Sequence, residues 1–186
     1  MLMRCLRLRG GRFWRDRRGF AAVEFALVLP VLLLFALGVS EVALFVMLGL
    51  KVQHAADTVA DLASGSASLT AAQLTDTFNA VRHIVQPFDA AGRGVVIVSG
   101  ISAQGSGSPT IVWQRRGVGS LSAASQVGGQ GGNASLPAGL TLRDGEAVIV
   151  AEMYYRYESM LLGIVPDSTV RRVAFYRPRF LMPPSL

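Results

Sequence analysis

One carboxylate, Glu24, stands in an apolar stretch of the sequence, five residues after Gly19 in the string RRGFAAVEFALVLPVLL (residues 17–33). A charged side chain deep in a bilayer costs roughly 2.5 to 3.5 kcal/mol on insertion scales. Glu24 lies about one helical turn from Phe20, so its side chain can reach the membrane interface at small cost. Taken alone, Glu24 is therefore a carboxylate that the membrane interface tolerates. Pro30, which removes a helix hydrogen bond and favours a kink, is a second unusual residue in this stretch.

The other residues that could perform chemistry do not form a pattern typical of an enzyme. His54 has Asp57 and Asp61 on neighbouring turns, but without a second histidine or a cysteine a solvated polar face is favoured over a metal site. No serine stands in a G-x-S-x-G elbow, and the string GGQGGN (residues 128–133) lacks the Lys-Ser/Thr of a phosphate loop. Cys5 is the only cysteine, which excludes an intramolecular disulfide. We predict no catalytic residue, metal or cofactor.

Positive charge is concentrated in the first 19 residues. They hold seven arginines and one acid, so their net charge of +6 equals that of the whole chain. A basic segment directly before an apolar run is typical of a cytoplasmic flank by the positive-inside rule. The rest of the chain has no basic patch with interleaved aromatic residues. The sequence therefore predicts a cytoplasmic N-terminus and no nucleic-acid partner.

The apolar segment after the leader is long enough to span a membrane. Phe20 to Ser40 comprises 21 residues, about 32 Å of helix, which matches a hydrocarbon core of about 30 Å. A cleaved secretory signal would have an apolar region of about 7 to 15 residues and a small-residue cleavage site. The first such site here, ASGSAS (residues 63–68), comes far too late. We expect a retained single-pass segment, with Glu41 near the outer interface and the chain after Lys51 outside the cytoplasm.

Together, the basic leader, Gly19, Glu24 and Pro30 carry a resemblance to a known family. A leader ending in glycine, followed by an apolar helix with glutamate at its fifth position, resembles the processing site of type IV prepilins. The string RRGFAAVEFALVLPVLLLFALGVSEV is similar to the start of the TadE-like pseudopilins of the tight-adherence (Tad) pilus. The likeness covers about 35 residues in detail and the rest only in layout.

The resemblance implies a processing step and a role for the carboxylate. A membrane peptidase would cut on the cytoplasmic side between Gly19 and Phe20, removing the arginines and creating an ammonium group on Phe20. Glu24 would then pair with the N-terminus of a neighbouring subunit and, with Pro30, set the register of packing. The partners implied are the prepilin peptidase, other pilins and pseudopilins, and the inner-membrane assembly platform with its ATPase.

The remaining sequence predicts two helical regions and four strands. A stripe of Val52, Ala55 or Ala56, Val59 and Leu62 or Ala63 extends the first helix to about Ser64, and residues 69–88 form a second amphipathic helix. Strands are expected at residues 95–101, 110–116, 146–159 and 168–178, the first two as a hairpin. Residues 117–139, rich in Gly, Ser and Ala, are expected to form a surface loop.

The aromatic and basic residues of the last two predicted strands leave two interpretations open. A period of two places Tyr155 and Tyr157 on the face opposite Tyr154. Packing within the sheet is favoured over a contact surface for a partner, and Arg171 with three further arginines (Arg172, Arg177 and Arg179) could rim such a surface.

The predicted fold class is therefore α+β and pilin-like: a long, partly transmembrane N-terminal helix, a short second helix and an antiparallel sheet of about four strands. We divide the chain into a prepilin leader (residues 1–19), a transmembrane and assembly helix (20–50) and an extracytoplasmic domain (51–186). The function expected is that of a non-enzymatic minor pseudopilin in the bacterial inner membrane, which helps to assemble a Tad-type pilus for surface adhesion. The alternative is an uncleaved, membrane-anchored binding protein.

Overall fold

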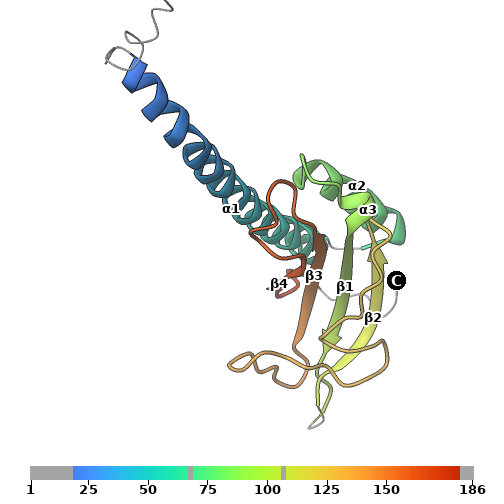
Figure 1. Ribbon diagram of the computed structural model, residues 1–186. Coiled ribbons are helices and arrows are strands. Elements are labelled where there is room, and N and C mark those ends of the chain that lie inside the picture. Colours follow the sequence, from blue (N-terminus) through green and yellow to red (C-terminus); the bar gives the residue numbers. More distant parts are fainter. Residues whose placement is uncertain (1–18, 67–68, 106–107, 181–186) are drawn as a thin grey trace, which may run out of the picture. The chain divides into compact units, whose positions relative to one another are not determined.

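The computed structural model describes residues 19–66, 69–105 and 108–180 (Figure 1). The basic leader up to Arg18, with Cys5, lies outside the described residues. The elements in chain order are α1 (Phe20–Gly65), α2 (Ala71–Ile84), α3 (Ala90–Arg93), β1 (Gly94–Ser102), β2 (Thr110–Gly117), β3 (Ala147–Tyr157) and β4 (Ser168–Tyr176). The predicted α+β class is confirmed.

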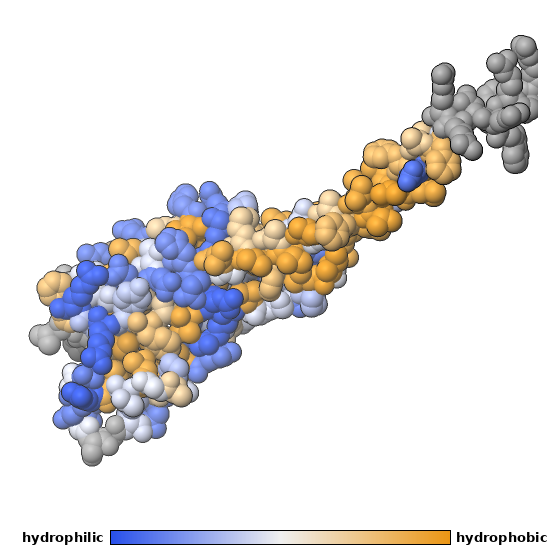
Figure 2. Space-filling model, turned by 90° about the vertical axis from the view of Figure 1, so that its left-hand side faces the viewer, coloured by the Kyte–Doolittle hydropathy of each residue, from blue (hydrophilic) through white to orange (hydrophobic). Residues whose placement is uncertain are grey.

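Helix α1 is continuous through Pro30, but the chain divides into two compact units between Ser40 and Glu41. In the first unit the side chains of α1 are exposed and almost all apolar, and Figure 2 shows this helix surface as nearly uniformly hydrophobic. Within the described ranges, one helix is long and apolar enough to cross a membrane, and it is α1. A helix that is apolar all round is suited to a lipid environment.

From Glu41 onward, α1 buries one stripe of side chains. The buried residues include Val52, Ala55, Ala56, Val59, Ala60 and Ala63. The predicted stripe is confirmed, and of the two candidates at its end Ala63 is buried whereas Leu62 is 47% exposed. These side chains share one core with the even-numbered residues Val96 and Val98 of β1 and with Met153 and Tyr155 of β3. The small alanines leave room for the larger side chains that the sheet and α2 contribute to this core.

Helix α2 is shorter than the predicted range of residues 69–88. It begins after Thr70, whose side chain accepts a hydrogen bond from the Gln73 backbone while Gln73 binds the Thr70 backbone in return. This capping box fixes the first turn. The helix ends at Ile84, ahead of Pro87, and buries Leu74, Phe78 and Val81 as its spacing predicts. The one-turn helix α3 was not predicted, and its start is capped by the side chain of Asp89.

The sheet is antiparallel with the strand order β2-β1-β3-β4. The predicted hairpin of β1 and β2 is confirmed, although residues 106 and 107 of its turn are outside the described part. Tyr155 and Tyr157 face the helices and Tyr154 faces the other way, as the period of two predicts. All three are at least 96% buried, so they serve packing within the domain rather than a partner surface.

The segment between β2 and β3 is a loop, as predicted, but it covers the second face of the sheet. Val127 is 2% exposed and packs with Val150 and Ile111, while Leu121 packs with Val95. Strand β1 is therefore buried on both faces from Gly94 to Ile101. A continuous apolar run such as VVIV is what a doubly covered strand requires.

We predict that Gly100→Ala destabilises the domain, because a Cβ at this position would lie 2.3 Å from the ring of Trp113, which is 1% exposed. Overpacking of this kind typically costs about 1 to 3 kcal/mol. The measurement is the melting temperature of the full chain in detergent. Gly129→Ala is the matched control, since its Cβ would meet nothing within 4 Å. Equal melting temperatures for the two variants would contradict the packing described.

Candidate functional site

Gly19, Phe20 and Glu24 lie together at the start of α1. Gly19 stands in a short turn of 3-10 helix directly before α1, and Phe20, its first residue, is 72% exposed. Phe20 and Glu24 are four residues apart in one helix, which places them on the same face. An added Cβ on Gly19 would meet nothing within 4 Å, so the backbone at this position is uncrowded.

Pro30 lies apart from this cluster. It is six residues beyond Glu24, which at 3.6 residues per turn places it on a different face of α1. Its ring nitrogen cannot donate to the carbonyl group of Ala26, so one backbone acceptor in this part of the helix lacks its usual partner. Of the four residues singled out from the sequence, three therefore lie together at the start of α1, and Pro30 lies apart on a different face.

A buried carboxylate that sequence reasoning did not identify as a site is Glu41. It is fully buried, and it accepts hydrogen bonds from the backbone N–H groups of Leu162 (3.1 Å) and Ile164 (3.2 Å) and from the hydroxyl of Ser159. The same hydroxyl oxygen accepts from the N–H of Gly163 at 2.8 Å. These donors are uncharged, and they belong to the loop that joins β3 to β4. Glu41 therefore fixes this loop against α1.

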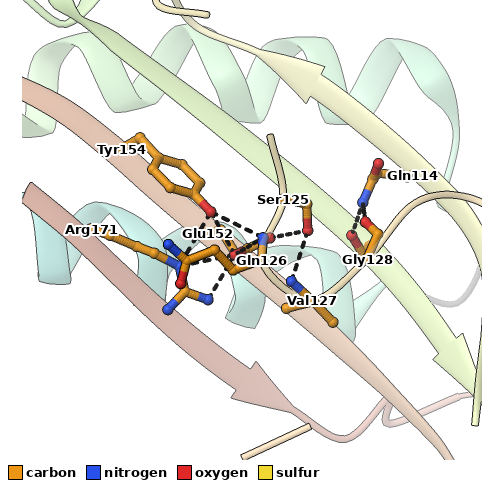
Figure 3. A network of polar contacts seen from close by, with 9 residues as sticks. Gln114, Ser125, Gln126, Val127, Gly128, Glu152, Tyr154 and Arg171 are labelled. Carbon is orange, nitrogen blue, oxygen red and sulfur yellow. Dashed lines mark hydrogen bonds and ion pairs between the residues drawn. The ribbon is translucent and has the colours of Figure 1, made fainter. Parts of the chain in front are cut away.

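A second buried carboxylate, Glu152, holds the loop that crosses the opposite face of the sheet (Figure 3). Arg171 donates to one carboxylate oxygen from Nη2 at 2.7 Å and from Nε at 3.0 Å. The Tyr154 hydroxyl (2.9 Å) and the Gln126 backbone N–H (3.1 Å) donate to the same oxygen, and the Ser125 hydroxyl donates to the other. The two strands β3 and β4 are thereby tied to residues 125 and 126 of the loop.

The neighbours of Glu152 titrate away from their usual range. Burial, followed by the hydrogen bond to Glu152, raises the pKa of Tyr154. Burial lowers the pKa of Arg171, but its hydrogen bonds to Glu152 and Tyr154 outweigh this effect, so that its pKa is raised. The phenol therefore stays neutral and the guanidinium stays charged at physiological pH. The cluster is a stable ion pair with satisfied donors, not an acid or base poised for proton transfer.

The C-terminal arginines also have partners within the domain. Besides the pair of Arg171 with Glu152, Arg177 lies 3.4 Å from Glu146 and Arg179 lies 2.7 Å from Asp61. The side chains of Arg177 and Arg179 nevertheless remain 65% exposed, so their interpretation as the rim of a partner surface stays a prediction. Asp61 is also one of the acids considered beside His54, and in the residues that the structure describes no group of three His, Cys, Asp or Glu side chains is placed to hold a metal ion.

Residues 19–61 match a family model described as TadE-like protein. The matched region starts at Gly19, contains Phe20, Glu24, Pro30 and Glu41, and includes all but the last turn of α1. It leaves out α2, α3 and the sheet. Comparisons with curated proteins and with solved structures found no match.

The cluster around Glu152 lies outside the matched region, and its role can be tested by substitution. Arg171→Met should destabilise the domain by roughly 3 kcal/mol, because it leaves a buried carboxylate without its cation. Denaturant unfolding of the full chain in detergent provides the measurement. The double variant Arg171→Met with Glu152→Gln should recover part of this loss, since the neutral amide can still accept from Tyr154 and Gln126. A double variant less stable than the single one would contradict the assignment.

Proposed function

We propose that this chain, whose residues 19–61 match the TadE-like family model, acts as a minor pseudopilin in the assembly of a Tad-type pilus for surface adhesion. The observation that carries the proposal is the coincidence at the start of α1: the family match begins at Gly19, the helix begins at Phe20, and the one acid of the apolar segment follows at Glu24. A plain anchor requires none of these three to coincide.

The charge distribution supports the proposed topology. The seven leader arginines favour a cytoplasmic N-terminus by the positive-inside rule, and residues 20–40 are long enough to cross the bacterial inner membrane. The domain from Glu41 onward then lies on the outer side. Its proposed partners are the prepilin peptidase, other pilins and pseudopilins, and the membrane assembly platform with its ATPase.

Cleavage between Gly19 and Phe20 changes the electrostatics at the start of α1. The new ammonium group on Phe20 adds a full positive charge to the end of the helix that already carries a partial positive charge. When the subunit leaves the bilayer for a bundle of helices, this charge loses its contact with water and headgroups. Glu24 of a neighbouring subunit supplies the opposite charge, and because both groups are costly to bury unpaired, the pair selects one packing register. Pro30 lies further along the same helix and helps to set this packing register.

The alternative is a single-pass protein that keeps its leader and displays a binding domain. It is favoured by the compact unit from Glu41 onward, which could bind a partner without any part in a pilus. An enzymatic role is not proposed, since the two buried carboxylates hold loops rather than facing a substrate site.

Intact mass measurement of the protein from native membranes separates these two functions. We expect a mature chain that starts at Phe20 when the peptidase is present, and a chain with its leader intact when the peptidase gene is deleted. A leader that persists in the presence of the peptidase would contradict processing and favour the anchored binding protein.

Substitution of the carboxylate tests its role in assembly. Glu24→Leu should still insert into the membrane, because it makes the apolar segment more hydrophobic, but it should abolish incorporation into pili. Fractionation shows insertion, and immunoblotting of sheared pili shows assembly. Val28→Leu, one turn further along α1, is the matched control and should assemble normally. Pili that form normally with Glu24→Leu would refute the charge pair.

A further inference from the structure

The loop between β3 and β4 exposes a cluster of large apolar side chains. Its residues 159–166, SMLLGIVP, carry no charge, and Glu158 and Asp167 border them. Four side chains of the loop are largely exposed: Met160 (49%), Leu161 (46%), Leu162 (41%) and Ile164 (54%). Single exposed apolar residues are ordinary, but a contiguous group of this kind marks a surface that another apolar phase covers.

The conformation of the loop is set by polar contacts on its inner side. Leu162 and Ile164 direct their backbone N–H groups to Glu41, and Gly163, with φ of +71°, donates to Ser159. Val165 packs against the main core. The backbone donors are therefore turned toward α1, and the apolar side chains are left on the outside.

The contact with Glu41 also places the loop along α1. Glu41 directly follows the 21 residues from Phe20 to Ser40, which match the thickness of a bilayer core. A loop bonded to Glu41 thus stands where the spanning length ends. Figure 1 shows this loop, between β3 and β4, beside α1.

We propose that residues 160–164 insert into the outer interface of the membrane and form a second contact between the domain and the lipid, beside the helix. This inference rests on the membrane anchoring in the proposed function, but not on processing or pilus assembly. Irregular backbone is costly in an apolar phase because of its free N–H groups, and here three of them already have acceptors in Glu41 and Ser159.

The charged residues that border the loop limit how deeply it can insert into the membrane. Glu158 forms an ion pair with Arg93 at 2.8 Å, and Asp167 accepts from the backbone of Ser159 at 2.9 Å. Both remain at the aqueous side in a shallow insertion. Lipid, rather than a second copy of the chain, is the occupant that we favour, because lipid adjoins α1 at this level as soon as the helix is inserted.

A fluorescent probe at the loop tests the insertion. In a Cys5→Ser background, the only native cysteine is removed, and Leu161→Cys is labelled with an environment-sensitive dye. Gln130→Cys, exposed on the loop across the other sheet face, is the matched control, and Met160→Cys repeats the measurement if the first variant folds poorly. The full chain is reconstituted at low density in phospholipid vesicles, with and without lipids spin-labelled near the headgroup.

We expect the probe at position 161 to show blue-shifted emission and to be quenched by the spin-labelled lipid, whereas the probe at 130 shows neither. Emission at 161 equal to that at 130, in vesicles to which the chain is bound, would overturn the inference alone. A blue shift that appears only at high protein density, without quenching by lipid, would assign the loop to a second copy and would also overturn it. Failure of the chain to float with the vesicles would refute the membrane anchor and this inference together.

Discussion

Burial of the second half of α1 in one core with the sheet and α2 is the constraint on which the domain depends. Alanine is the commonest residue among the buried positions of α1, so many of the larger side chains in this core come from the sheet and from α2, among them Trp113, Met153 and Phe78. The ring of Phe45 on α1 meets Tyr157 edge to face at 5.0 Å, beyond the alanine stripe. One helix therefore serves two purposes: before Glu41 it is apolar on all sides, and after Glu41 it has a narrow face of small residues for the sheet.

Most of the elements follow from local sequence patterns. The period of the buried residues in α1 and α2 and the alternation in β3 require only nearby residues, and both are found in the structure. The start of α2 is set by the side-chain cap at Thr70, and the helix ends at Ile84, ahead of Pro87, so it is shorter than its apolar pattern. The pairing of β1 with β3 and the position of the loop across the sheet depend on contacts between distant segments. The sequence signal for this cover is the continuous apolar run VVIV in β1, which is typical of a strand that is buried on both faces.

The residues of the candidate site also differ in whether the sequence alone could identify them. Gly19, Phe20, Glu24 and Pro30 form a motif within twelve consecutive residues, so their spacing could be recognised without a structure. The roles of Glu41 and Glu152 could not, because their partners lie far along the chain: Ser159 is 118 residues from Glu41, and Ser125 is 27 residues from Glu152. Glu41 could be placed at the end of the apolar segment from sequence, but its burial arises from the chain that folds over it.

The bonds between Glu41 and the β3–β4 loop have a consequence for sequence change. Two of the three donors are backbone N–H groups, so the shape of the loop depends on Ser159, on the left-handed conformation of Gly163 and on the carboxylate, but not on which side chains stand at positions 160, 161, 162 and 164. The outer surface can thus diverge or be replaced while the scaffold beneath it stays the same. In this respect the loop resembles a display site, in which a constant frame presents exchangeable residues.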